Sequence, residues 1–238
     1  MAFNAASFKA NPITYLGQKQ FITPGTTGSL TSTDITGSAQ LPGSDMEVKT
    51  VSNQTSLKYF SVADGNAYVA TMADSSGDFR AYWLPWRSGY AFKMTLGSTV
   101  DVFITAKMNS CGIIIGGPEA TPTVIHANTE NVTVPVFDKN ADIATAMQQA
   151  RSIQTSEYKL AYGNLAAQAI RADYFGTGKS NVGVIDPEFY LTDKLTSMSV
   201  FGIRASGTWT FYANLHTAGK QGITMEIWPT QPKTLPRV

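Results

Sequence analysis

The sequence predicts an α+β fold, a mainly antiparallel β-sandwich flanked by helices. Two observations support this prediction. Short runs rich in β-branched and aromatic residues occupy much of residues 46–137 and return after Leu195, whereas residues 138–174 carry apolar side chains at helical spacing. A chain that passes through strands, then helices, then strands again is typical of a fold in which helices pack against an antiparallel sheet.

The composition is that of a folded globular chain. Of its 238 residues, 43% are hydrophobic and 15% are charged, and the mean hydropathy is −0.08. A chain of this length buries a substantial core. Because the sequence shows neither an internal repeat nor a long linker, we expect residues 1–238 to form a single domain.

The beginning of the chain predicts little regular structure. Residues 1–45 are rich in Thr, Ser, Gly and Asn, so we expect an irregular N-terminal region with short strands at Ile13–Leu16 and Gln20–Thr23. Further on, Gly65-Asn66 separates two alternating runs, which is typical of a hairpin turn.

The most apolar strand pattern is Phe79–Leu84. Pro85 follows it directly and is expected to end this strand or to place it at a sheet edge, because proline cannot donate a ladder hydrogen bond. Four further strands are predicted before the helical region: Val100–Ala106, Gly112–Ile115, Thr123–Ala127 and Val132–Phe137.

The helical region is predicted as Asp138–Gln154 followed by Thr155–Tyr174. Asp186-Pro187-Glu188 indicates another helix start, because proline is favoured at the first helical position. The chain is then expected to return to strands and to end in a Pro-rich tail at 230–238. These last strands are Met198–Ala205, Thr208–Ala213 and Ile223–Trp228.

Charge and hydropathy argue against nucleic-acid and membrane partners. The chain has 18 basic and 17 acidic residues, for a net charge of +1, and no run of Lys or Arg, so a protein or small-molecule partner is favoured. No stretch approaches the roughly 18 continuous apolar residues of a membrane span. The N-terminus has no basic segment followed by an apolar one, so no cleavable secretion signal is predicted.

The candidate chemistry depends on the single cysteine, Cys111, and on one of two histidines. A lone cysteine excludes an intrachain disulfide and a cysteine-based zinc site. Cys111 begins one predicted strand, and His126 lies in the next. If these strands pair as a hairpin centred near Glu119, Cys111 lies opposite Ala127 or His126, and directly opposed Cβ atoms are about 4.5–5.5 Å apart.

A thiol beside an imidazole can act as a nucleophile with its base. The imidazole takes the thiol proton, and the thiolate attacks an acyl carbon. A third group must orient the imidazole, and Thr105 on the preceding strand is the candidate, through its hydroxyl or its backbone carbonyl. The alternative is that Cys111 only packs and that His126 is a satisfied polar residue. His216, the other histidine, is expected in the core or on the surface rather than in the cleft.

Residues 79–126 resemble a known family. The run Trp83-Leu84-Pro85-Trp86-Arg87-Ser88-Gly89 is similar to a Trp-Leu-Pro-Trp motif of the Burkholderia lethal factor-like toxins, and residues 102–111 resemble a strand of that family that ends in Leu-Ser-Gly-Cys. Gly116-Gly117-Pro118 and Val124-Ile125-His126 resemble its Gly-Gly-Pro and Trp-His motifs. This chain differs at Met108-Asn109-Ser110, where serine replaces the glycine before the cysteine, so the oxyanion-binding loop departs from the family pattern.

The resemblance implies a glutamine deamidase, similar in active site to the catalytic domains of cytotoxic necrotizing factors. Such enzymes convert a specific glutamine of a host protein to glutamate by a Cys–His mechanism. For this chain the resemblance implies Cys111 as nucleophile, His126 as general base and Thr105 as the residue that orients the histidine. No metal or organic cofactor is implied.

The same resemblance implies a bacterial toxin, which we expect to be a monomer exported without a recognisable cleavable signal and acting in the host cytosol. The favoured substrate is a DEAD-box translation-initiation helicase, whose deamidation would stop protein synthesis. Two alternatives stay open. One is a deamidase or transglutaminase that acts on Rho-family GTPases, and the other is a catalytically inactive binding module on the same fold.

Overall fold

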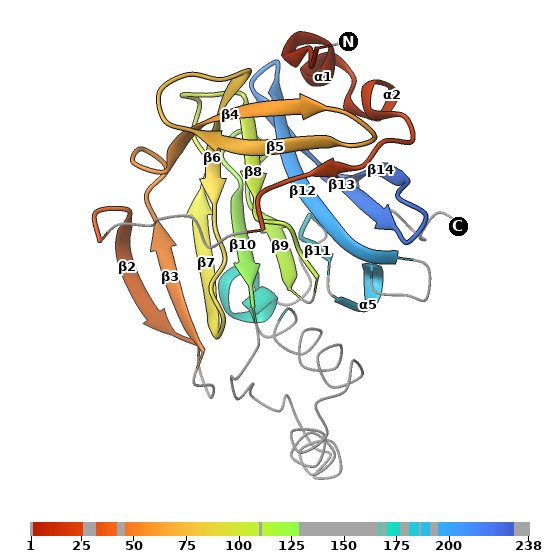
Figure 1. The fold of residues 1–238 in the computed structure, drawn as a ribbon. Helices are drawn as coiled ribbons and strands as arrows, with labels where there is room; N and C mark the ends of the chain where they lie inside the picture. Colours follow the sequence, from red (N-terminus) through yellow and green to blue (C-terminus); the bar gives the residue numbers. More distant parts are fainter. Residues whose placement is uncertain are drawn as a thin grey trace.

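A computed structural model of the chain describes residues 2–25, 32–41, 46–109, 111–128, 167, 170–176, 181–185, 187–190 and 195–230. Within these ranges the chain is rich in β-strand and carries few helices, and its strands form two sheets (Figure 1). The β-rich character of the predicted fold is therefore confirmed. No helix among the described residues is long and apolar enough to cross a membrane.

The larger sheet has eight strands in the order β1-β5-β4-β6-β8-β12-β13-β14. Strands β8 and β12 meet near its centre although they are far apart in sequence, with Phe201 opposite Ile104. The bounds of its strands are β1 Phe21–Ile22, β4 Leu57–Asp64, β5 Tyr68–Ala73, β6 Phe79–Leu84, β8 Val102–Thr105, β12 Leu195–Ala205, β13 Thr208–Thr217 and β14 Gly222–Trp228.

The smaller sheet has six strands in the order β11-β9-β10-β7-β3-β2. Its centre is the hairpin of β9 and β10, which lies between β11 and β7. The bounds of its strands are β2 Ile35–Gln40, β3 Glu47–Val51, β7 Tyr90–Thr95, β9 Gly112–Gly116, β10 Thr123–Ala127 and β11 Gly183–Ile185.

Most strand pairs are antiparallel, as predicted. The parallel pairs among the described strands are β1 with β5, β3 with β7, and β6 with β8. The pairing of β6 with β8 matters for the candidate site, because it aligns Leu84 with Thr105.

One hydrophobic cluster, here called the central core, takes side chains from both sheets. Leu84 and Phe103 of the larger sheet pack in it with Ile113 and Val124 of the smaller sheet. Alternate residues of the same strands belong to two other clusters, one containing the N-terminal helices and one containing the helical residues 170–175. Because successive strand side chains point to opposite faces, each sheet turns one face toward the central core.

The N-terminal region is more regular than predicted. The expected strand Ile13–Leu16 is wrong, because this segment lies in helix α2 (Pro12–Leu16), which follows helix α1 (Ala5–Ala10). Asn11 is the N-cap of α2 and its side chain accepts a hydrogen bond from the Thr14 backbone N–H at 3.0 Å, with Pro12 at the first helical turn. This cap favours a helix start, against the strand preference of the β-branched residues that follow it.

Several predicted strands and one predicted helix start are confirmed. Strands β4 and β5 form the expected hairpin, in which Asp64 lies opposite Tyr68. Strand β6 ends at Leu84, directly before Pro85, but it lies between β4 and β8 rather than at a sheet edge. Helix α5 (Pro187–Tyr190) begins at the predicted proline.

Some predictions fall outside the described residues. These are the strand Val132–Phe137, the helix Asp138–Gln154, most of the helix Thr155–Tyr174 and most of the tail 230–238. Residues 170–175 are helical, which agrees with the end of the second predicted helix.

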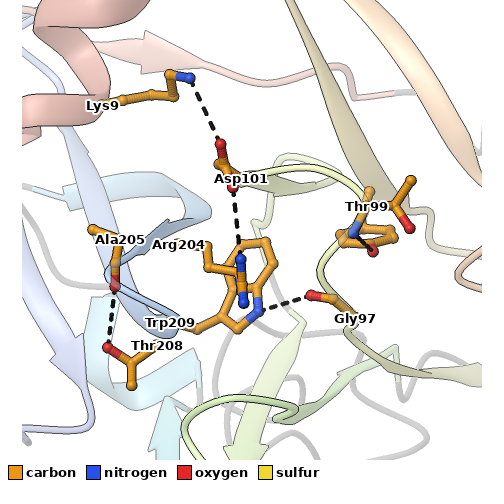
Figure 2. A network of polar contacts seen from close by, with 9 residues as sticks. Lys9, Gly97, Thr99, Asp101, Arg204, Ala205, Thr208 and Trp209 are labelled. Carbon is orange, nitrogen blue, oxygen red and sulfur yellow. Dashed lines mark hydrogen bonds and ion pairs between the residues drawn. The ribbon is translucent and has the colours of Figure 1, made fainter.

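A network of polar contacts joins helix α1 to the larger sheet (Figure 2). Asp101 lies 3.9 Å from Lys9 Nζ and 3.9 Å from an Arg204 guanidinium nitrogen, and these side chains are partly exposed. Exposed ion pairs of this length contribute little free energy. The Trp209 indole N–H donates to the Gly97 carbonyl at 3.3 Å, which helps to position the loop before β8.

Candidate active site

The three predicted catalytic residues are brought together on the inner faces of the two sheets. Thr105 ends β8 of the larger sheet, His126 lies in β10 of the smaller sheet, and Cys111 directly precedes β9. Thr105 is two residues after Phe103, and His126 is two residues after Val124, both members of the central core. By strand alternation their side chains therefore point into the space between the sheets.

The β9–β10 register differs from the prediction by one residue. Ala127 lies opposite Gly112, and His126 lies opposite Ile113, so Cys111 falls opposite Asn128. The prediction that Cys111 lies opposite Ala127 or His126 is wrong. The observed register still places Cys111 and His126 on the same face, as diagonal neighbours, whereas pairing with Ala127 would have placed them on opposite faces.

A hydrogen bond between the sheets orients the imidazole. Thr105 Oγ1 lies 2.6 Å from His126 Nδ1 and donates to the Leu84 carbonyl at 2.7 Å. A hydroxyl has one proton to donate, and Leu84 receives it, so Nδ1 must be the donor to Thr105. His126 Nε2 is therefore unprotonated and carries the lone pair that a general base needs.

That lone pair lies in a buried, unpaired position. His126 Nε2 has no hydrogen-bond partner among the described residues. The exposed fractions of Thr105, His126 and Cys111 are 0%, 0% and 3%. Burial lowers the pKa of His126 to about 3, because the charged imidazolium would lose its hydration. At neutral pH the side chain is therefore uncharged.

Two further residues hold Cys111. The side-chain amide of Asn128 donates to Cys111 Sγ at 3.3 Å, and the Tyr190 hydroxyl donates to the Cys111 carbonyl at 2.7 Å. Both residues are buried. Asn128 directly follows β10, and Tyr190 is the last residue of α5.

Sequence reasoning missed Asn128 and Tyr190. A signal for Asn128 was present, because it lies two residues after His126 and strand alternation places the two on one face. No such signal existed for Tyr190, since only tertiary packing brings α5 to Cys111. Ser110, where the chain differs from the toxin family, lies outside the described residues.

The Trp-Leu-Pro-Trp segment supports the site through its backbone. The Leu84 carbonyl accepts a hydrogen bond from the Thr105 hydroxyl, and the Gly89 N–H donates one to Asn128 Oδ1 at 3.3 Å. The two tryptophans themselves have packing roles. Trp83 is buried, and Trp86 packs against the cluster that contains the N-terminal helices.

His216 has a different environment. It lies in β13, where Ser197 Oγ contacts Nδ1 at 2.9 Å and the Phe21 carbonyl contacts Nε2 at 3.2 Å. A carbonyl only accepts, so Nε2 carries the proton and Nδ1 accepts from Ser197. With both nitrogens paired and the side chain buried, His216 is a core residue, as expected.

Because two histidines are buried, we expect the protein to lose stability in mild acid. Burial lowers the pKa of His216 to about 4, and nearby Lys107 adds to this effect while the Phe21 carbonyl opposes it. Both folded-state pKa values lie below the unfolded value of about 6.5, so the unfolded chain binds more protons in this interval. Stability is therefore full above about pH 6.5 and falls as the pH drops toward the folded values, by up to about 1.4 kcal/mol per pH unit for each histidine.

Urea unfolding at intervals from pH 7 to pH 5 measures this slope. His216→Gln should make the slope shallower, because one of the two titrating groups is gone. Hydrogen bonds from Ser38 and Lys19 lower the pKa values of Glu47 and Asp64 respectively. The protonation of these two carboxylates therefore affects stability mainly at a lower pH than that of the histidines. An unchanged slope in the variant would show that His216 does not titrate in this way.

The comparisons with known proteins leave the family open. No protein-family model matches the chain, and a search of curated proteins finds no match. The resemblance to deamidase toxins therefore stays a prediction. Among the described residues, no group of three or more His, Cys, Asp or Glu side chains is placed to hold a metal ion.

Proposed function

We propose that this chain is a protein-glutamine deamidase in which Cys111 is the nucleophile, His126 the general base and Thr105 the residue that orients the imidazole. The observation that carries the proposal is the bond from His126 Nδ1 to Thr105 Oγ1 at 2.6 Å. It leaves the Nε2 lone pair on the sheet face that also carries Cys111. In the core residue His216, by contrast, Nε2 is paired with the Phe21 carbonyl.

The reaction would proceed through a thioester. His126 Nε2 takes the thiol proton, and Cys111 Sγ forms a bond to the glutamine carboxamide carbon. His126 then gives that proton to the nitrogen as the carbon–nitrogen bond breaks and ammonia leaves. Water attacks the thioester, its proton passes through His126 to the departing sulfur, and the products are glutamate and a restored thiol.

Proton transfer needs a hydrogen-bonded path from the thiol to Nε2, which the free protein does not make directly. No hydrogen bond reaches Nε2 among the described residues. Rotation of the Cys111 side chain, or a bridging water, would complete the relay. Hydrogen bonds of this kind are often long in free enzymes and shorten when substrate binds.

We further interpret the two sheets as a β-sandwich flanked by helices, the arrangement expected for deamidase toxins. The favoured role is that of a bacterial toxin that acts in a host cell. The favoured target is a DEAD-box translation-initiation helicase, and its loss would stop protein synthesis. This choice rests on the Trp-Leu-Pro-Trp resemblance alone. In this chain the backbone of that segment bonds to Thr105 and Asn128, which positions the site rather than selecting a target.

The test is a proteomic comparison in a eukaryotic cell lysate. Wild-type protein is expected to convert specific glutamines to glutamate, whereas Cys111→Ser should convert none of them, because a serine hydroxyl is a far weaker nucleophile without strong activation. Conversion sites that appear equally with both proteins would disprove the mechanism.

The same experiment separates the alternatives. Adding a labelled primary amine reveals a transglutaminase, because the amine would replace water in attacking the thioester. Conversion of a Rho-family GTPase instead of a helicase would change the target but not the chemistry. A folded wild-type protein that converts no glutamine in lysate would indicate an inactive binding module.

A further inference from the structure

We propose that Asn128 is a catalytic residue whose side-chain amide stabilises the Cys111 thiolate. The inference rests on the proposed function in one respect, namely that Cys111 is the nucleophile. The amide Nδ2 lies 3.3 Å from Cys111 Sγ, so it touches the reacting atom. The proposal adds a fourth residue to the predicted set of Cys111, His126 and Thr105.

The orientation of the amide follows from its neighbours. The Gly89 backbone N–H, which can only donate, points at Asn128 Oδ1 at 3.3 Å. The oxygen of the amide must therefore face Gly89, and its NH₂ group must face the sulfur. The Asn128 backbone N–H also donates to the Tyr90 carbonyl at 3.0 Å, which continues the pairing of β10 with β7.

Gly89 can make this contact because of its backbone conformation. Its φ is 78°, in the left-handed region that side chains disfavour. The glycine of the Trp-Leu-Pro-Trp segment therefore has a defined role, which is to aim an N–H group at Asn128. It holds the amide in place before the sulfur acquires charge.

The charge state of the site explains why an amide donor is needed. Before proton transfer His126 is neutral because of its burial, so it presents no positive charge that would help the thiol to ionise. A thiol is a weak hydrogen-bond acceptor, whereas a thiolate is a strong one. An N–H donor in a buried site thus favours the thiolate over the thiol, and it costs no reorganisation when the charge forms.

The experiment measures the thiolate directly. Cys111 is the only cysteine in the sequence, so the rate of alkylation by iodoacetamide as a function of pH reports this thiol alone. Asn128→Asp keeps an acceptor for Gly89 but replaces the donor beside the sulfur with a carboxylate. The midpoint of the profile is expected to rise by at least about one pH unit, which means roughly tenfold less thiolate below the midpoint.

Asn181→Asp is the matched control. Asn181 is exposed and donates to the Gly117 carbonyl, beyond the far end of β9, so the same charge change there should leave the midpoint unchanged. Asn128→Ala provides a second variant if aspartate disturbs folding. It should also raise the midpoint, by less than Asn128→Asp, because the donor is lost but no charge is added. His126 and Tyr190, two titratable neighbours of Cys111, are retained in every variant.

Two readouts separate this inference from the proposed function. An unchanged midpoint in folded Asn128→Asp and Asn128→Ala proteins would overturn the role of Asn128, even if wild-type protein deamidates glutamine. A raised midpoint together with wild-type protein that deamidates nothing would support the thiolate contact and refute the deamidase. The full inference requires a raised midpoint and a matching loss of deamidation at neutral pH.

Discussion

Replacing His126 with asparagine is expected to lower the rate of glutamine deamidation by about four orders of magnitude or more, the scale seen when the base of a nucleophile–base pair is removed. Asparagine suits this test because its short amide can still donate to Thr105 from near the position of Nδ1. What it lacks is Nε2, the nitrogen assigned to proton transfer. The change therefore removes the base while keeping the bond between the sheets.

A graded series makes this prediction specific. Thr105→Val removes the acceptor of the His126 Nδ1–H group and leaves a buried N–H unpaired, so the rate should fall by about a hundredfold or more. Thr105→Ser keeps the hydroxyl and should stay close to wild type. The measurement is single-turnover deamidation of a target identified in lysate, with far-ultraviolet circular dichroism as the check on folding.

The combination of variants gives the outcome that would contradict the assignment. If Thr105 acts through His126, then adding Thr105→Val to His126→Asn should cost almost nothing more, because residues that act as a unit are not additive. Independent losses that multiply would mean that Thr105 has a separate role. An active His126→Asn protein would exclude His126 as the base.

Gly222→Ala is expected to destabilise the fold by about 3 kcal/mol, at the upper end of the range for overpacking. A Cβ atom at position 222 would lie 2.1 Å from the Lys19 carbonyl oxygen and 2.5 Å from its carbon, which are backbone atoms that cannot rotate away. The Gly222 N–H also donates to the Gln18 carbonyl at 2.8 Å. The N-terminal segment would have to leave β14, the last strand of the larger sheet.

Equilibrium unfolding in urea measures this effect. The midpoint should fall while the slope with denaturant stays constant, since both proteins unfold from the same fold. Gly219→Ala is the control, because a Cβ atom there meets nothing closer than the Thr217 hydroxyl oxygen at 3.7 Å. Equal midpoints for the two variants would mean that residues 18–20 do not pack closely on β14.

Local patterns predicted the β9–β10 hairpin of the smaller sheet and much of the candidate site. The turn-rich segment 116–122 between two apolar runs specified the β9–β10 hairpin, because strand pairing across a short turn is a local property. It also placed Cys111 and His126 near each other. The observed register differs by one residue from the predicted one, since the length of a turn does not by itself determine which residues lie opposite each other.

The N-terminal helices show how local signals can compete. Asn11 and Pro12 form a helix start, but Ile13 and Thr14 favour a strand, and the strand was predicted. Burial of Leu16 in a cluster with Phe8 and Phe21 stabilises the helix, and that packing involves residues beyond the segment. A short segment with opposed preferences is decided by its tertiary contacts.

By itself, the sequence determined the chemistry available to this protein: one thiol, two imidazoles, and a hairpin that brings the thiol near one of them. Only the tertiary structure decided how these groups are oriented. Thr105 belongs to a different sheet from His126, and its bond to Nδ1 exists because the two sheets meet at the central core. Asn128 faces the sulfur because a turn in the chain aims the Gly89 N–H at its oxygen. Contacts between distant segments depend on how whole sheets pack, and no local pattern of residues specifies that packing.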